Sequence, residues 1–214
     1  MTAFVKTRLF ATPLARLGAL VLATLAAAPA SAHHMMDGEM PQTFVQGLLS
    51  GLGHPVIGID HLAFVVAVGI AAGLLGRSLL LPAAFVVATV AGVVVHLQSV
   101  DLPLAELVIA ASVLAVGALI VTGTALPRAG WAALFALAGL FHGYAYGESI
   151  VGAEPAPLYA YFLGFAVIQT AIASLAMLLT APRAAGQAGA LMPRLVGAGV
   201  VGVGLSALSA QLFG

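Results

Sequence analysis

The chain alternates between long apolar stretches and short turns that contain Gly, Pro, Arg, Asp or Glu. An α-helix rises about 1.5 Å per residue, so about 20 apolar residues are needed to cross the hydrocarbon core of a bilayer. Six stretches meet this length. The pattern predicts an all-α, polytopic membrane protein whose six transmembrane helices form a bundle, at approximately 56–76, 78–97, 102–121, 129–147, 157–180 and 191–213.

A shorter apolar stretch, residues 43–53, precedes the first span and is too short to cross a bilayer. It is followed by His54 and Pro55. A residue before proline is biased away from helix, whereas proline itself suits the first turn of a helix. We therefore expect a half-helix or an interfacial segment that leads into the first span. If helix continues through Pro55, His54 and His61 lie two turns apart on one face; otherwise His54 caps the span.

The first 32 residues have the pattern of a secretory signal peptide. Lys6, Arg8 and Arg16 form a positive region, an apolar stretch follows at 17–29, and Ala-Ser-Ala at 30–32 matches a cleavage site. The alternative is an uncleaved first helix. We expect cleavage, which leaves residues 33–214 as a single six-helix transmembrane domain with 33–53 as a periplasmic leader and half-helix.

Composition agrees with this class, because 62% of residues are hydrophobic and only 7% are charged, against about 25% charged in soluble domains. The formal net charge is zero, so no basic surface is available for nucleic acid. No cysteine is present, which restricts metal-binding side chains to His, Asp, Glu and Met. The expected partners are the lipid bilayer and a small substrate, and a homo-oligomer is left open.

Charge also predicts an orientation. With the N-terminus in the periplasm, the loops after spans one, three and five lie in the cytoplasm. All four arginines of the mature chain fall on that side, as the positive-inside rule requires: Arg77, Arg128, Arg183 and Arg194. We expect a multi-pass protein of the bacterial inner membrane, with a periplasmic N-terminus.

Aromatic side chains with a polar end are common at both membrane interfaces. The four tyrosines, Tyr144, Tyr146, Tyr159 and Tyr161, lie in sequence near the expected periplasmic ends of spans four and five. Trp131 lies near the expected cytoplasmic end of span four. We expect the tyrosines to form the outer aromatic belt and Trp131 to mark the inner interface.

Ionisable side chains within a span are costly and usually face a protein interior or an ion path. Five of them belong to the outer half of the predicted bundle: His54, Asp60, His61, Glu106 and His142. Imidazole together with carboxylate suits Ni²⁺, Co²⁺ or Zn²⁺ better than Mg²⁺ or Ca²⁺. We expect these residues to converge on a transition-metal ion, with Glu106 in the cation path, whereas His96 taken alone fits a hydrogen-bonded helix contact.

The expected mature N-terminus is also rich in metal-binding groups. His33 and His34 are followed by two methionines and Asp37. Together with the free amine they could collect a metal ion outside the membrane. The alternative is a disordered junction without a function of its own.

Two segments resemble the signature segments of the HupE/UreJ family of nickel and cobalt permeases. The first runs from His54 to His61 and matches H-x₅-D-H, and the second is Phe-His-Gly-Tyr-Ala-Tyr-Gly-Glu at 141–148. The family pattern F-H-G-x-A-H-G-x-E has His where this chain has Tyr146 and an acid where it has Ser149, while Glu148 comes one residue early. The resemblance implies ligand or pathway roles for His54, Asp60, His61 and His142, to which we add Glu148.

The resemblance and the residues together predict a secondary permease that imports Ni²⁺ or Co²⁺ through a His and carboxylate site in the outer half of the bundle. The metal is its substrate, no resident cofactor is expected, and the protein is not expected to be an enzyme. An alternative is a membrane haem protein with axial ligands among His61, His96 and His142. An intramembrane hydrolase is disfavoured because the chain has no H-E-x-x-H motif, and Ser50 has no partner His in span six.

Overall fold

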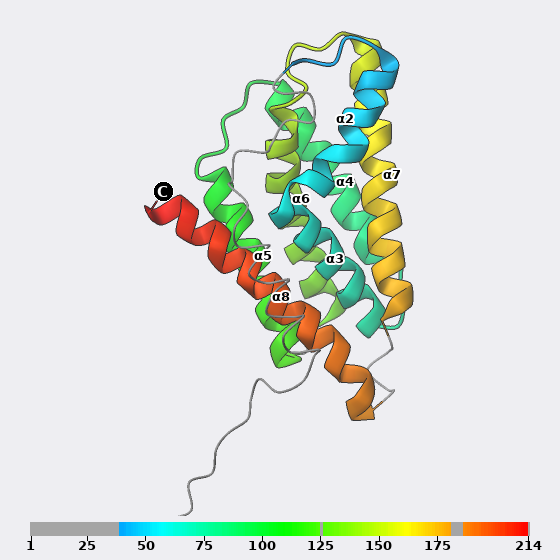
Figure 1. Cartoon of the computed structure of the whole chain (residues 1–214), viewed down its shortest axis with the longest axis vertical. Coiled ribbons are helices and arrows are strands. Elements are labelled where there is room, and N and C mark those ends of the chain that lie inside the picture. Colours follow the sequence, from blue (N-terminus) through cyan, green and yellow to red (C-terminus); the bar gives the residue numbers. More distant parts are fainter. Residues whose placement is uncertain (1–38, 125, 181–185, 214) are drawn as a thin grey trace, which may run out of the picture.

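The structure is a computed structural model that describes residues 39–124, 126–180 and 186–213. The predicted signal peptide, His33, His34 and Arg183 lie outside these residues. The described chain is all helical (Figure 1), with α2 (Phe44–Ile57), α3 (Ile59–Leu74), α4 (Leu80–Leu97), α5 (Ala105–Thr122), α6 (Arg128–Gly147), α7 (Pro155–Leu179) and α8 (Gly186–Phe213). The last five follow the predicted spans two to six closely.

The first span is broken into α2 and α3. A capping box of Thr43 and Gln46 starts α2, which continues through Pro55, and the chain then bends by 80° between α2 and α3. Helix thus continues through Pro55, one of the two alternatives for this segment, and ends at Ile57. The break lies at Gly58, where a Cβ would come within 2.6 Å of the ring of His61. Glycine leaves room for that imidazole against the bend.

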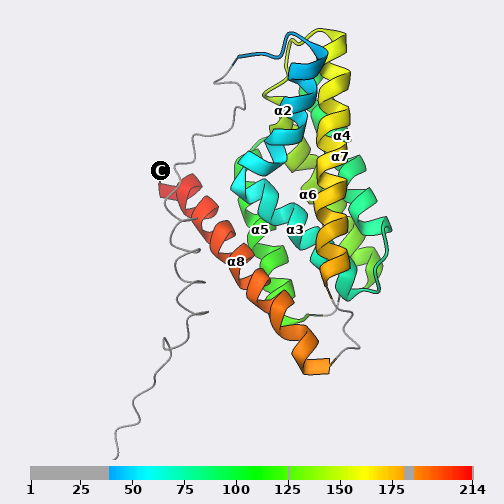
Figure 2. The same cartoon turned by 45° about the vertical axis from the view of Figure 1, so that its right-hand side comes forward.

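Helix α7 lies beside both halves of the broken span (Figure 2). Gly47 and Gly51 of α2 face the backbone of Pro157 and Tyr161, and Gly69 of α3 faces that of Ala173. Small residues let helix backbones approach closely in a membrane protein, where packing rather than hydrophobic burial drives association. The long, continuous α7 thus holds α2 and α3 on either side of their bend.

Helices α4 and α6 form a second close pair. Gly143 faces the backbone of Thr89, and a Cβ on Gly147 would meet the side chain of His96 at 2.6 Å. The spacing of Gly143 and Gly147 is a Gly-x-x-x-Gly pattern, which is common where membrane helices approach closely. This pairing places α6, and with it His142, in the interior of the bundle.

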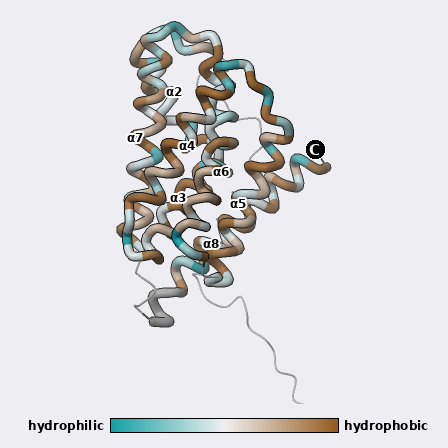
Figure 3. The backbone as a smooth tube through the Cα atoms, turned by 180° about the vertical axis from the view of Figure 1, so that it is seen from behind, coloured by the Kyte–Doolittle hydropathy of each residue, from teal (hydrophilic) through white to brown (hydrophobic). Residues whose placement is uncertain are grey.

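Four helices are long and apolar enough to cross a membrane: α4, α5, α7 and the Leu191–Phe213 part of α8. The bent pair of α2 and α3 would make a fifth. Figure 3 shows hydrophobic residues along most of the helix lengths and hydrophilic ones mainly on the connections. Large apolar side chains also remain exposed on the outer faces, as lipid contact requires. The protein is a multi-pass helical membrane protein, and the count of six spans stays a prediction.

Arg77, Arg128 and Arg194 lie at one end of the bundle, which we call the arginine end. Arg77 donates to the backbone oxygen of Leu178 at 3.2 Å, and Arg128 donates to that of Leu75 at 3.2 Å. Arg194 lies beside Gly123, at the end of α5. The loops that hold Asp101 and Glu154 belong to the opposite ends of their helices. This segregation of charge is the one that the sequence predicts.

Candidate metal site

Four buried side chains meet at the bend between α2 and α3. His54 comes from the end of α2, His61 from the start of α3, and His142 and Tyr146 from α6. The ring centroids of His54 and His61 are 6.0 Å apart, and the ring of Tyr146 lies 4.9 and 4.5 Å from them. We call these four residues the histidine cluster. The predicted convergence of His54, His61 and His142 is thus present in the structure.

The hydrogen bonds of His142 define the protonation of two imidazoles. Ser112 Oγ donates to the backbone oxygen of Ile109 at 2.7 Å, so it accepts from His142 Nε2 at 3.1 Å. A neutral His142 then carries its lone pair on Nδ1, which lies 2.8 Å from Nδ1 of His61. His61 Nδ1 must be the donor. This bond holds the ring of His61 through Nδ1, as an outer partner holds a metal-binding histidine.

His54 is held in the same way by another set of partners. Its Nδ1 lies 3.0 Å from Ser149 Oγ and 3.0 Å from the Tyr161 hydroxyl. Both hydroxyls donate to the backbone oxygen of Tyr146, at 3.1 and 2.8 Å. Ser149 Oγ also lies 3.2 Å from the Tyr161 hydroxyl, so the two hydroxyls form one hydrogen-bonded set around His54 Nδ1. These bonds hold the ring of His54 through Nδ1.

Asp60 places a carboxylate next to His61. It is half-buried in the first turn of α3, and its Oδ1 accepts from the backbone N–H of His61 at 2.8 Å. A carboxylate is favoured at a helix N-terminus because the first N–H groups have no partner within the helix. Such a local role explains the position of Asp60, and the same carboxylate also supplies negative charge beside the histidine cluster.

Two tyrosines that were expected in an outer aromatic belt are instead fully buried. Tyr146 and Tyr161 have no exposed surface, whereas Tyr159 is 69% exposed and Tyr144 is half-buried. Residues two apart on a helix point in nearly opposite directions, so the members of each pair cannot share one environment. The belt prediction is wrong for Tyr146 and Tyr161, which face the histidine cluster.

The hydroxyl of Tyr146 has no hydrogen-bond partner among the described residues, although it is buried. An unpaired buried hydroxyl usually costs about 1–3 kcal/mol. It belongs to the side chain that stands where the family pattern has its second histidine.

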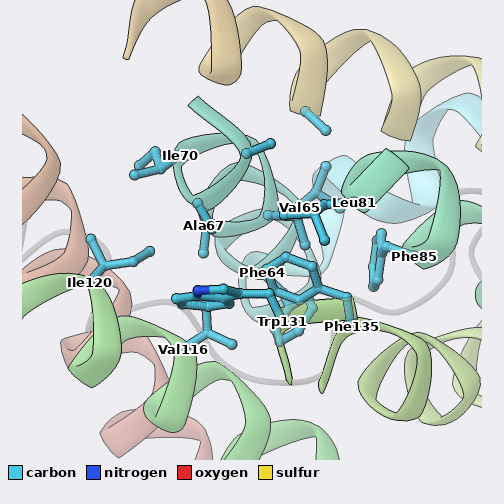
Figure 4. Close-up of a cluster of buried hydrophobic side chains, with 14 of the residues drawn as sticks. Phe64, Val65, Ala67, Ile70, Leu81, Phe85, Val116, Ile120, Trp131 and Phe135 are labelled. Carbon is cyan, nitrogen blue, oxygen red and sulfur yellow. The ribbon is translucent and has the colours of Figure 1, made fainter. Parts of the chain in front are cut away.

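Phe64, Phe85, Phe135 and Trp131 form an aromatic group in the core of the bundle (Figure 4). Phe64 packs against His142 with a centroid separation of 4.5 Å, and also against Phe85 and Phe135. Trp131 extends this group from Phe135. Trp131 is 1% exposed, so its predicted place at the membrane interface is wrong. Its indole packs in the core beneath the site instead.

The sequence singled out three further ionisable residues. Glu106 is half-buried in the first turn of α5, and Glu148 is exposed at the end of α6, next to Ser149, which contacts His54. His96 packs on Tyr144, with centroids 4.4 Å apart. Within the described residues, no three His, Cys, Asp or Glu side chains are grouped as a ready metal site. The bend thus brings together buried imidazoles, an adjacent carboxylate and a phenol.

The geometry of the histidine pair also bears on haem binding. Two axial imidazoles must leave room for iron and the porphyrin plane between their nitrogen atoms. The Nδ1 atoms of His61 and His142 lie only 2.8 Å apart and share a hydrogen bond. This pair therefore does not favour the haem alternative.

The fold and site define a helical membrane protein with a buried polar centre at a broken helix. Comparison with known sequences agrees with this class, because the model of the HupE / UreJ protein family matches residues 20–207. The chain therefore belongs to the HupE/UreJ family. It is also similar to Protein HupE of Rhizobium leguminosarum bv. viciae, with 32% identity over 164 residues, which cover 76% of this chain and 84% of that protein. No solved structure matches the chain.

Sequence reasoning missed several residues that hold the site in place. Ser112 and Tyr161 orient two histidines, and Tyr146 stands between them. Ser149 was noticed only as a departure from the family pattern, yet it contacts His54. A serine or tyrosine in an apolar helix gives no signal of its own, because the direction in which it points depends on how the helices pack.

Proposed function

We propose that the protein is a secondary permease that takes up Ni²⁺ or Co²⁺ and binds it at the histidine cluster. The observation that carries this proposal is the pair of buried imidazoles, His54 and His61, which meet at the bend with Nδ1 in a hydrogen bond and Asp60 beside them. Membership of a family whose members generally transport nickel or cobalt supports the same function.

The chemistry suits a site that binds an ion and also releases it. Imidazole ligands favour borderline ions such as Ni²⁺ and Co²⁺, and the carboxylate of Asp60 offsets part of their charge in a region of low dielectric constant. Two imidazoles and one carboxylate are fewer ligands than a structural site with four protein ligands uses. An ion held by them keeps water ligands and can move on.

The proposal includes an orientation for the chain. The arginine end faces the cytoplasm, the bend between α2 and α3 lies in the periplasmic half, and residues 1–32 are removed as a signal peptide. The positive-inside rule supports this orientation. With six spans, both the mature N-terminus and the C-terminus are in the periplasm, and His33 and His34 supply a capture site for the ion.

Uptake of radioactive nickel or cobalt by cells expressing the protein tests the function. Asp60→Asn keeps size and hydrogen bonding but removes the charge, so it should abolish uptake at normal protein abundance. His61→Ala should do the same. Asp101→Asn, a change at an exposed acid, is the matched control and should behave as wild type. Wild-type uptake by Asp60→Asn at limiting metal would overturn the proposal.

A further inference from the structure

A buried amide lies beyond the histidine cluster and was not expected from the sequence. Gln169 of α7 has no exposed surface, and its neighbour Thr89 of α4 has none either. An amide in the interior of an apolar bundle is costly unless its polar atoms are paired. The pairing of these atoms shows which of them is available to a ligand.

The orientation of the Gln169 amide follows from its neighbours. Nε2 donates to the backbone oxygen of Phe165 at 3.2 Å and to Thr89 Oγ1 at 3.4 Å. Thr89 Oγ1 uses its own hydrogen on the backbone oxygen of Val86, at 2.8 Å. Turning the amide over would set Oε1 against the carbonyl of Phe165, acceptor against acceptor. Both amide hydrogens are therefore used, and Oε1 is the remaining polar atom.

Gln169 Oε1 is buried and has no hydrogen-bond partner among the described residues. If the amide served only to join α4 and α7, its two N–H groups would be sufficient. A buried carbonyl oxygen left unpaired gains a contact when a water molecule or a cation that has shed its water shell reaches it. The Gln169 oxygen is a neutral ligand of the same kind as the carbonyl oxygens that line cation paths.

The position of Gln169 relates it directly to the histidine cluster. Phe165, four residues earlier on α7, lies with its ring 5.9 Å from that of Tyr146. Gln169 follows one helical turn, or about 6 Å, further towards the arginine end. Thr89 lies opposite Gly143, the neighbour of His142. The amide is thus the next polar group inward from the cluster along α7.

We propose that Gln169 Oε1 is a second binding station for the transported divalent cation, between the histidine cluster and the arginine end. This inference rests on the proposed permease function. A single neutral oxygen binds Ni²⁺ or Co²⁺ more weakly than imidazoles do, and conduction requires sites from which the ion can leave. Gln169 receives the ion from the cluster, and Thr89 positions its amide.

The test compares nickel uptake with nickel binding in Gln169→Met, which keeps the length of the side chain but removes the oxygen. Maximal uptake per protein should fall about tenfold, because the inward step loses its ligand. The affinity of the histidine cluster for Ni²⁺ in the purified protein should stay within about twofold of wild type, because the cluster is intact, while the weaker second equivalent of Ni²⁺ is lost. Thr180→Val, which removes a buried hydroxyl at the C-cap of α7, is the matched control and should retain uptake.

The outcomes separate this inference from the proposed function. Wild-type uptake by Gln169→Met would overturn the second station alone, whereas no nickel or cobalt uptake by the wild-type protein would overturn the permease itself. Equal losses of uptake and of Ni²⁺ binding would assign Gln169 a purely structural role. If Gln169→Met does not fold, Gln169→Glu provides the test: it keeps an oxygen and adds charge, so the purified protein should retain a second equivalent of Ni²⁺. Retention of one equivalent would overturn the proposal.

Discussion

The Nδ1 atoms of His61 and His142 lie 2.8 Å apart, although 81 residues separate them in the chain. One imidazole donates to the other, and Ser112 determines the direction of this bond by accepting from the far side of His142. His142 therefore acts on His61 much as an outer-shell carboxylate acts on a metal-binding histidine: it fixes the tautomer and the ring orientation. We call this chain of hydrogen bonds, from His61 through His142 to Ser112, the relay. If both nitrogens of His142 carried a proton, His142 could no longer accept from His61, and the relay would break.

Ser112→Ala removes the acceptor for His142 Nε2 and frees His142 to change tautomer. We expect the affinity for Ni²⁺ to fall about 10- to 100-fold, as is usual when an outer-shell partner of a metal ligand is lost, while the protein still folds. Titration of the purified protein with Ni²⁺ measures this. Ser206→Ala, at an exposed position of α8, is the control. Equal affinities for both variants would refute the relay.

Tyr146→Phe removes a buried hydroxyl that has no described partner. Without metal, this variant should melt at a higher temperature than wild type, because an unpaired buried group costs about 1–3 kcal/mol. With metal, it should bind Ni²⁺ more weakly if the hydroxyl contacts the ion. Tyr144→Phe, at a half-buried position on another face of α6, should change neither property.

Tyr146→His restores the imidazole of the family pattern at the centre of the cluster. We expect it to shift the ratio of nickel to cobalt uptake, because a third imidazole favours ions that prefer nitrogen ligands. Competition between the two isotopes in cells measures this ratio. An unchanged ratio would mean that the side chain at this position does not face the ion.

Gly143→Val should prevent α4 and α6 from packing. A side chain there would meet the backbone of Thr89, which cannot move without separating the helices. Overpacking usually costs about 1–3 kcal/mol and more where backbone is the obstacle, so we expect a large loss of folded protein. Gly130→Ala is the control, since a Cβ there finds its nearest neighbour at 3.5 Å. Comparable abundance of the two variants in membranes would contradict the close pairing.

Reporter fusions test the proposed orientation. Fusions after Arg77, Arg128 and Arg183 should report the cytoplasm, and fusions near Asp101 and Glu154 the periplasm. A periplasmic signal at Arg128 would reverse α6 and overturn the arrangement.

Mass spectrometry of the extracted protein tests cleavage of the signal peptide. It should find His33 as the first residue, and intact residues 1–32 would refute cleavage.

The spacing of polar residues along the chain was sufficient to locate most of the helices and to group the histidines. Helix length is set by the thickness of the bilayer, so the ends of α4 to α7 could be predicted to within a few residues. His54, His61 and His142 were expected together because they lie at one depth, and depth follows from distance along a helix. The family pattern pointed to the same residues.

Only the tertiary structure decided which way the side chains point around each helix. The side chains of Tyr146, Tyr161 and Trp131 point into the bundle because of how α6 and α7 are rotated about their axes. Glycine contacts with neighbouring helices set this rotation. The bend at Gly58 likewise depends on the room that His61 needs. In an apolar bundle every helix face is hydrophobic, so the sequence determines the depth of a residue in the membrane, and packing determines its partners.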